Sequence, residues 1–320
     1  MTTGAQIWVL ADDRAGNVAQ ALGVAEALGV PFKVFAVRYT RWGELHNLLR
    51  WSSRRGLTRD CRKQLEPPWP TLVIGAGRRT APLALWLKRK FVCQLVQVMN
   101  PGWPGRRHFD LIAAPAHDDL PDRPNVLHTL GSCHRARPEL LAEQAALWAP
   151  RLAALPRPYV MVTVGGATKE NGFGPERCRQ LVAQVNALHR ALGGALLVTT
   201  SRRSGLMVEE ALAAGLTEPR QLHRWSEGGD NPYFGFLGLA DVVVATGDSM
   251  NMCTEACATG GPVYIFAPPG MVNDKHARLH QTLYAAGLAR PLEGDHRPWT
   301  HPPLNAAIAV AEEIRRRGMV

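Results

Sequence analysis

The stretch LADVVVATGDSMNMCTEACATGGPVYIFAP, residues 239–268, holds a strand, a loop, a helix and a second strand. Residues 240–245 form an apolar, β-branched run, which is typical of a strand buried on both faces of a parallel sheet. After a polar break, either Asp248 or Ser249 can cap a helix, and residues 263–266 start the next strand. In open α/β sheets a ligand binds beyond the carboxyl ends of the strands, where a helix N-terminus offers N–H groups to an anion. The stretch therefore predicts an α/β fold and a place for an anionic ligand.

The composition predicts a globular protein with two domains. The chain of 320 residues exceeds the usual size of one hydrophobic core, and its 46% hydrophobic and 20% charged residues are typical of soluble proteins. No apolar run reaches the roughly 20 residues that a membrane span needs, and the N-terminus has no signal-peptide pattern, so we expect a cytoplasmic protein. The six cysteines form no C-x-x-C pair, which argues against a zinc knuckle or a disulfide framework.

The net charge of +10 is concentrated in the first half of the chain. Residues 1–155 contain 21 lysines and arginines against 12 acids, whereas residues 156–320 contain 16 against 15. A one-sided basic field indicates an anionic partner for the first half, either a membrane surface or a nucleic acid.

The N-terminus repeats the β-loop-α-β pattern, with strands at 7–10 and 32–37 around a polar loop and a helix. Asp12 and Asp13 lie in that loop. One of them can simply cap the helix, but a second adjacent acid needs another reason and is a candidate for function. The candidates for ligand contact in this half are Asp12, Arg14, Asn17 and His117, the last because it follows a predicted strand at 111–114.

The segment 39–69 interleaves tryptophan and leucine with arginine and lysine. This pattern is typical of a segment that lies in a membrane interface, with its apolar side inward and its basic side toward anionic headgroups. The alternative is a solvated basic helix whose apolar stripe belongs to the core. The membrane-facing candidates are Trp42, Trp51, Arg50, Arg54 and Arg55.

A linker rich in proline and arginine at 150–158 predicts a boundary between two domains, 1–155 and 156–320, with a terminal helix at 304–317 that can pack back on the first domain. Beyond the linker, a strand at 159–164 runs into Gly165 and Gly166. Glycines allow a backbone to approach a diphosphate closely, and Lys169 or Arg202 can neutralise it. Earlier in the chain, residues 75–80 offer a second glycine- and arginine-containing turn that either holds a phosphate or is a tight turn.

These patterns together predict two Rossmann-like domains that face a cleft. The chain has no G-x-G-x-x-G fingerprint followed by an acid, no P-loop motif and no G-x-S-x-G elbow, which argues against a dehydrogenase, a P-loop kinase and an α/β hydrolase. A ligand that carries a diphosphate, held by the second domain, fits what remains.

The residues also carry a resemblance. Residues 241–268 resemble the donor-binding segment of GT-B glycosyltransferases, and five ordered motifs resemble the "elongated mitochondria one" family, which joins plant mitochondrial-fission factors with bacterial proteins regarded as glycosyltransferases. The similarity covers nearly the whole chain. The motifs are Ala11-Asp12-Asp13-Arg14-Ala15-Gly16-Asn17, Val164-Gly165-Gly166, Thr199-Thr200-Ser201-Arg202-Arg203, Asp230-Asn231-Pro232-Tyr233 and Thr246-Gly247-Asp248-Ser249.

The resemblance implies a role for each matching residue. Glu255 would bind the ribose of a nucleotide-sugar, and Asp13 would deprotonate the acceptor hydroxyl if the transfer inverts configuration. The other candidates of the first half, Asp12, Arg14, Asn17 and His117, would then lie on the acceptor side. The nucleotide-sugar would be a substrate, and neither a metal nor a resident cofactor would be needed, because a helix dipole and an arginine can offset the charge of the departing diphosphate. The diphosphate would be held by Gly165, Gly166, Arg202, Asp248, Ser249 and Met250.

Three functional hypotheses follow. The first is a glycosyltransferase at the cytoplasmic membrane face that uses a nucleotide-sugar and an envelope lipid or a lipid-linked acceptor. The second is a non-catalytic peripheral membrane adaptor that recruits a partner protein, as the plant members of the family do. A nucleic-acid binder is the third and is disfavoured, because the first half has no recognition-helix motif.

Overall fold

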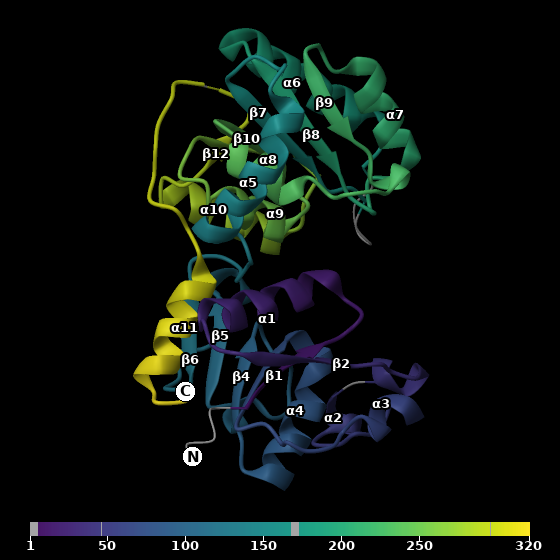
Figure 1. Ribbon diagram of the computed structural model, residues 1–320, viewed down its shortest axis with the longest axis vertical. Helices are drawn as coiled ribbons and strands as arrows, with labels where there is room; N and C mark the ends of the chain where they lie inside the picture. Colours follow the sequence, from purple (N-terminus) through teal and green to yellow (C-terminus); the bar gives the residue numbers. More distant parts are fainter. Residues whose placement is uncertain (1–5, 46, 168–172, 295) are drawn as a thin grey trace. The chain divides into compact units, whose positions relative to one another are not determined.

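The chain forms two compact α/β units (Figure 1). The computed structural model describes residues 6–45, 47–167, 173–294 and 296–320. The first unit comprises Met1–Arg135 and Ala306–Val320, and the second comprises Ala136–Asn305. Each unit is built on a six-stranded parallel sheet, which confirms the predicted α/β class with two Rossmann-like domains.

The sheet of the first unit has the strand order β2-β1-β3-β4-β5-β6. All of its pairings are parallel, so each strand is followed by a crossover back to the same end of the sheet. The strands are β1 (Ile7–Ala11), β2 (Phe32–Ala36), β3 (Leu72–Ala76), β4 (Gln94–Val98), β5 (Leu111–Pro115) and β6 (Val126–Thr129).

Helices cover both faces of this sheet because its strands are apolar on both sides. In β1, Val9 packs in the cluster with α1 (Ala15–Ala27) and the terminal helix α11 (Ala306–Arg316). Trp8 points to the other face, where it packs with residues of α4 (Gly77–Phe91). The alternation follows from the two-residue period of a strand.

Short helices fill the remaining segments of the first unit. Between β2 and β3 lie η1 (Arg41–Glu44), α2 (Asn47–Arg50) and α3 (Arg59–Lys63). Two further turns, η2 (Arg106–His108) and η3 (Ala116–Asp118), flank β5. Within the part of the chain that the structure describes, no helix is both long enough and apolar enough to cross a bilayer.

The sheet of the second unit has the order β12-β11-β10-β7-β8-β9 and is also parallel throughout. Its strands are β7 (Tyr159–Val164), β8 (Ala195–Thr200), β9 (Arg220–His223), β10 (Val242–Thr246), β11 (Val263–Phe266) and β12 (Arg290–Pro291). One face packs on α6 (Pro175–Leu192) and α7 (Gly205–Gly215). The other face packs on α5 (Pro138–Leu152), α8 (Tyr233–Leu239), α9 (Met250–Ala256) and α10 (Asp274–Ala285), and η4 (Trp225–Glu227) follows β9.

The boundary between the units differs from the predicted division between residues 155 and 156. The helix α5 belongs to the second unit, because Leu141 and Leu152 are buried in its core and the Trp148 ring meets Phe236 of α8 edge-on, with centroids 5.7 Å apart. Pro150, read as the start of the linker, lies inside the last turn of α5. The terminal helix α11 belongs to the first unit and contacts α1.

The predicted turn at 75–80 is also different in the structure. Gly75 lies in β3, which ends at Ala76, and α4 begins at Gly77, so the glycines and arginines of this segment form a strand end and a helical first turn instead of a phosphate loop. Gly77 has a positive φ of 68°, and a Cβ there would lie 2.8 Å from the side-chain nitrogen of Asn17. The glycine therefore lets the first turns of α1 and α4 approach each other closely.

Each sheet has a topological switch point, where consecutive crossovers leave in opposite directions. In the first unit it lies between β1 and β3, and in the second unit between β7 and β10. Ligands of doubly wound sheets bind at the carboxyl ends of the strands at such points. The acidic loop after β1 and the glycine pair after β7 both lie at a switch point, so the topology singles out two of the predicted motifs.

Candidate functional site

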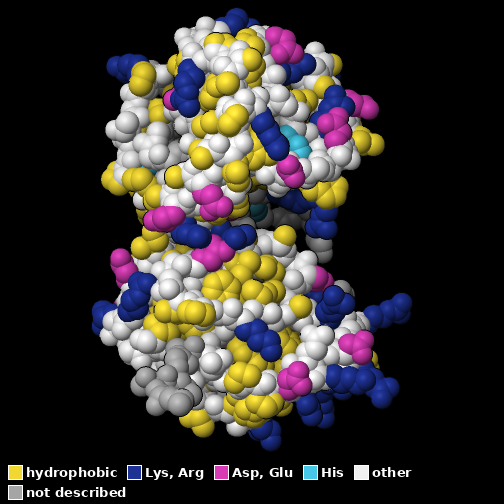
Figure 2. Space-filling model, viewed as in Figure 1, with side chains coloured by type: hydrophobic (Ala, Val, Ile, Leu, Met, Phe, Trp, Pro, Cys, Tyr) yellow, Lys and Arg dark blue, Asp and Glu magenta, His cyan; other side chains and the backbone are white. Residues whose placement is uncertain are grey.

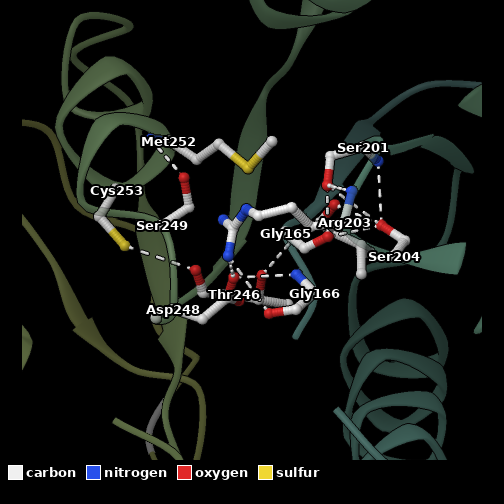
Figure 3. Close-up of polar contacts among 12 residues, drawn as sticks. Gly165, Gly166, Ser201, Arg203, Ser204, Thr246, Asp248, Ser249, Met252 and Cys253 are labelled. Carbon is white, nitrogen blue, oxygen red and sulfur yellow. Dashed lines mark hydrogen bonds and ion pairs between the residues drawn. The ribbon is translucent and has the colours of Figure 1, made fainter. Parts of the chain in front are cut away.

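The switch point of the second unit joins the loops that follow β7 and β10. Gly165 N donates to Thr246 Oγ1 at 2.8 Å, and Gly166 N donates to a carboxylate oxygen of Asp248 at 2.9 Å. Figure 3 shows these contacts between the two strand ends. We refer to these four residues, together with Arg203, as the switch-point site.

The glycine pair is needed for close packing inside the protein. A Cβ on Gly165 would lie 2.2 Å from the Asp248 carboxylate. A Cβ on Gly166, whose φ is 141°, would lie 2.2 Å from the carbonyl oxygen of Arg203. The sequence suggested that these glycines make room for a diphosphate. The structure shows that they make room for Asp248 and the Arg203 backbone.

The arginine of this site is Arg203, and the predicted Arg202 is exposed instead. The Arg203 guanidinium lies 3.0 Å from the Asp248 carboxylate and donates to Gly166 O at 3.3 Å. Its side chain is 36% exposed, whereas the Asp248 side chain is buried. Arg203 thus pairs with the loop after β10, whereas Arg202 is exposed. A cation with one side toward solvent therefore lies at the switch point.

Burial raises the pKa of Asp248 above its ordinary value. The Arg203 guanidinium and the hydrogen bonds from Thr246 and Gly166 act in the opposite direction but do not cancel the effect of burial. The fold therefore stabilises the neutral form of this carboxyl more than water does. Asp248, predicted to bind the donor, holds Gly166 and Arg203 in place.

Serine side chains anchor the loop that carries Arg203. Ser204 Oγ donates to Gly165 O at 2.6 Å and to Val164 O at 3.0 Å, and Ser201 Oγ donates to Gly165 O. These bonds attach the loop after β8 to the end of β7 (Figure 3). The motif Thr199-Thr200-Ser201-Arg202-Arg203 therefore positions one arginine against one glycine pair.

Helix α9 begins directly after Asp248. Ser249 is its N-cap, and the Ser249 hydroxyl accepts a hydrogen bond from Met252 N at 3.5 Å. Of the two capping residues that the sequence left open, the structure uses Ser249. The prediction that the amides of Ser249 and Met250 receive a diphosphate stays a prediction.

Glu255, the predicted ribose ligand, lies in α9 and is buried. The Tyr233 hydroxyl donates to Glu255 Oε2 at 2.6 Å. Burial and the nearby Glu255 charge raise the pKa of Tyr233 well above its ordinary value, so Tyr233 acts as a neutral donor. The sequence contained Tyr233 only as part of a family motif. Its hydrogen bond to Glu255 joins α8 to α9. The residues next to Tyr233 in the sequence do not indicate this partner.

A second polar network lies at the end of β8. Thr200 Oγ1 donates to Glu209 Oε1 at 2.8 Å and accepts from Trp225 N at 2.7 Å. Burial opposes ionisation of Glu209, but hydrogen bonds from Ser226 and Thr200 outweigh it and lower the Glu209 pKa. The Trp225 side chain is 51% exposed at the same edge of the sheet. Sequence analysis missed this tryptophan, because a single aromatic residue before a glycine-rich turn has no periodic context.

In the first unit, Asp12 and Asp13 have different environments. Asp12 accepts from Arg14 N at 3.0 Å and from the Asn17 side chain at 3.4 Å, so it shapes the loop before α1. Burial raises the pKa of Asp12 above its ordinary value. Asp13 is 65% exposed and lies 3.2 Å from the Arg79 guanidinium. The prediction that one of these acids caps the helix is wrong, because the N-cap of α1 is Arg14, whose side chain makes no capping hydrogen bond; Asp13 is accessible.

Arg50 and His117 do not occupy the positions that the sequence suggested. Arg50, a membrane-facing candidate, is only 4% exposed, because its guanidinium donates to the carbonyls of Gly43 and Arg79 and lies 4.8 Å from the Tyr39 ring. Burial raises the pKa of Tyr39 to about 12. His117, an acceptor-side candidate, is buried in η3, so it is not placed to meet a substrate.

The other membrane-facing candidates are exposed. Trp42 is 69% exposed and Trp51 is 38% exposed, and both lie in the segment between β2 and β3. Arg54 and Arg55 follow them and are also exposed. Lys169, the alternative phosphate partner, lies outside the described residues.

The two parallel sheets, each with polar loops at its switch point, define a chain of two Rossmann-like domains. The chain belongs to the mitochondrial fission ELM1 family, whose sequence model matches residues 15–318. "Uncharacterized protein RP120" of Rickettsia prowazekii (strain Madrid E) is 28% identical over 97% of both chains. "Mitochondrial fission protein ELM1" of Arabidopsis thaliana is 28% identical over 82% of this chain and 67% of its own length.

Solved structures share the two-domain fold. UDP-GlcNAc 2-epimerase from Methanocaldococcus jannaschii superposes with a TM-score of 0.54 at 12% identity, over 97% of this chain and 99% of the epimerase. UDP-GlcNAc 2-epimerase from Neisseria meningitidis, bound to UDP-GlcNAc, superposes with a TM-score of 0.53 at 11% identity, over 98% and 92% of the two chains. At this level of identity the likeness establishes the architecture.

Proposed function

We propose that the protein is a glycosyltransferase that moves a sugar from a nucleotide-sugar to an envelope lipid or a lipid-linked acceptor at the cytoplasmic face of a membrane. The observation that carries the proposal is Arg203, a partly exposed cation held at the switch point next to the start of α9. An arginine there can pair with a diphosphate, and the switch point is where doubly wound sheets bind nucleotides. The Neisseria epimerase, which shares the fold, is described with UDP-GlcNAc bound.

The donor would lie along the carboxyl edge of the second sheet. Arg203 would pair with the diphosphate, to which Ser249 and Met250 would offer amides, and Glu255 would bind the ribose. Because Tyr233 holds one oxygen of Glu255, the carboxylate keeps one orientation. Trp225 presents an exposed aromatic surface at the same edge, suited to stacking with a base.

The first unit would supply the base. The Asp13 carboxylate is exposed and would take the proton from the acceptor hydroxyl. The acceptor oxygen would then bond to the anomeric carbon, and the bond from that carbon to the diphosphate would break. The nucleoside diphosphate would leave with the electron pair, and Arg203 would offset its charge. The exposed Trp42, Trp51 and neighbouring arginines would bring this unit to the membrane.

Calorimetry of the whole chain with UDP, GDP, ADP and CMP tests the donor site. We expect one nucleoside diphosphate to bind, and Arg203→Met to weaken it about tenfold or more, since a charge-assisted contact is lost. Arg179→Met is the matched control, because Arg179 is exposed on α6 and pairs only with Glu176 among its described contacts. If none of the four nucleotides binds, the glycosyltransferase proposal is wrong.

A non-catalytic membrane adaptor is the second candidate, and one feature of the site favours it. Asp248 neutralises Arg203, and the amides of Gly165 and Gly166 bond to side chains within the protein. These groups satisfy each other in the way expected of a nucleotide fold that has lost its ligand. Glu255→Ala separates the candidates. If the variant loses both nucleotide binding and the biological effect, the enzyme is supported. If the variant keeps the biological effect, the adaptor is supported.

A further inference from the structure

A basic hollow in the first unit is not used by the proposed chemistry. It has a volume of about 620 Å³ and lies between the loop after α2, the end of α3 and the last turns of α4. None of the described residues that line it is acidic. Figure 2 shows lysine and arginine side chains gathered over the part of the first unit where Figure 1 places α2 and α3. Its cationic residues are Arg50, Arg54, Arg55, Arg62, Arg89 and Lys90.

The walls of the basic hollow are held in place by contacts inside the protein. Arg50 is fixed by two backbone carbonyls, and the Arg54 guanidinium lies 5.2 Å from the centroid of the Trp86 ring. Ser53 Oγ donates to Arg50 O and accepts from Arg55 N, which shapes the loop between them. Trp51 takes a left-handed backbone conformation, with φ at 35°, that residues other than glycine rarely adopt. The cations therefore lie on helices α2, α3 and α4 and on a loop that internal contacts hold in place.

Apolar side chains adjoin the basic hollow. Leu49 lines it and is 68% exposed, and Leu48, which precedes it, and Trp42 of η1 are also exposed. Leucine and tryptophan next to clustered arginine are suited to the boundary between headgroups and acyl chains, where apolar groups enter and cations meet phosphate. A binding site for free phosphate or for nucleic acid gains nothing from two exposed leucines.

We propose that the basic hollow binds the phosphate of an anionic phospholipid headgroup, with Leu48, Leu49 and Trp42 entering the acyl boundary. The inference rests on the membrane location in the proposed function and adds a defined site to it. Arg89 and Lys90 of α4 become membrane ligands, which the pattern of residues 39–69 alone does not indicate. Phosphate pairs with several arginines at once, and the lining places them around one space.

Co-sedimentation of the whole chain with vesicles tests this site. We expect binding to phosphatidylcholine vesicles that contain phosphatidylglycerol and little binding to phosphatidylcholine alone. Arg54→Gln with Arg89→Gln should weaken binding about 25-fold, since each cation near an anionic surface contributes about fivefold. The control is Arg179→Gln with Arg190→Gln, which removes the same charge from the exposed face of α6 and should change binding less than about twofold.

Leu49→Asp should also abolish vesicle binding, because the hollow alone does not supply the apolar contact. The proposal is overturned if the Arg54 and Arg89 variant binds vesicles as the parent does, or if the control pair loses as much. It is also overturned if Leu49→Asp binds normally and inorganic phosphate or duplex DNA binds the hollow in calorimetry. Nucleotide calorimetry on the same variants keeps the two proposals apart, since a failed donor site would leave vesicle binding intact.

Discussion

Asp248 gives a sharp test of how the switch-point site is stabilised, because its charge and its shape have separate effects. Asp248→Ala removes the acceptor of Gly166 N and the partner of Arg203. Leaving a buried N–H without an acceptor costs about 1–3 kcal/mol, and Arg203, being partly exposed, recovers some solvation. We therefore expect Asp248→Ala to lower the free energy of unfolding by about 2–3 kcal/mol.

Asp248→Asn keeps an oxygen for Gly166 N and removes the charge. Since burial raises the pKa of Asp248, the fold prefers a neutral group here, and we expect the asparagine variant to stay within about 1 kcal/mol of the parent. Because the pKa of Asp248 is higher in the folded protein than in the unfolded chain, its contribution to stability depends on pH. The contribution is fully present below the unfolded pKa of 3.8 and is lost as the pH rises through the folded pKa. The asparagine variant should lack that dependence.

Urea unfolding measures the loss for the whole unit, and hydrogen exchange of the peptide that contains Gly166 measures it locally. Exchange should speed up in Asp248→Ala and not in Asp248→Asn. The matched control is Asp230, whose pair with Arg151 at 3.3 Å is exposed on both sides, so both substitutions there should cost less than about 1 kcal/mol. An asparagine variant as unstable as the alanine variant would refute the reasoning, because the charge itself would then be stabilising.

Three further changes probe other contacts. Tyr233→Phe removes the donor to buried Glu255 and should cost about 1–3 kcal/mol in thermal unfolding and weaken any bound nucleotide; an unchanged stability would mean that the bond is dispensable. Gly166→Ala should cost more than about 2 kcal/mol, because its Cβ would clash with a backbone carbonyl, whereas Gly174→Ala, which meets open space, should be nearly neutral in the same measurement. Arg316 of α11 and Arg317 after it lower the pKa of Glu313 to about 2, and because Arg316 is exposed, Glu313→Gln should cost only about 1 kcal/mol near pH 7. Its stabilisation is present above pH 4.5 and is lost as the pH falls toward 2, so the gap in urea midpoint should shrink on acidification; a constant gap would contradict that sign.

The buried strands could be predicted from the sequence because a parallel strand covered on both faces is a continuous apolar run. The predicted strand at 240–245 is such a run, and the structure places β10 at Val242–Thr246, so its end is right to within one residue. The sequence also predicts that the N-cap of α9 is either Asp248 or Ser249, and the structure shows Ser249. These features depend on neighbours along the chain, and so they can be predicted from local sequence.

The contacts that could not be predicted from the sequence depend on which strands and helices are neighbours in the fold. Arg202 and Arg203 are chemically identical, and only the position of β10 beside β7 decides which of them meets Asp248. Arg50 looks like a surface cation until the carbonyls that surround it are known. In the same way, Pro150 resembles a linker residue unless α8 is known to bury the helix that carries it.

The polar groups of the switch-point site already bond to one another, and these bonds determine how the site can bind an anion. Arg203 already has Asp248 as a partner, so a diphosphate gains only the difference between two anionic partners for the same guanidinium. Burial raises the pKa of Asp248, which means that its charged form is costly to keep buried. Asp248 is therefore a weak competitor of the diphosphate for Arg203. The exposed part of Arg203 can therefore turn toward a ligand while the Asp248 carboxylate keeps its bond from Gly166 N. The Arg203–Asp248 ion pair therefore fits a working site as well as a lost one, because Asp248 can hold Arg203 in position for a diphosphate.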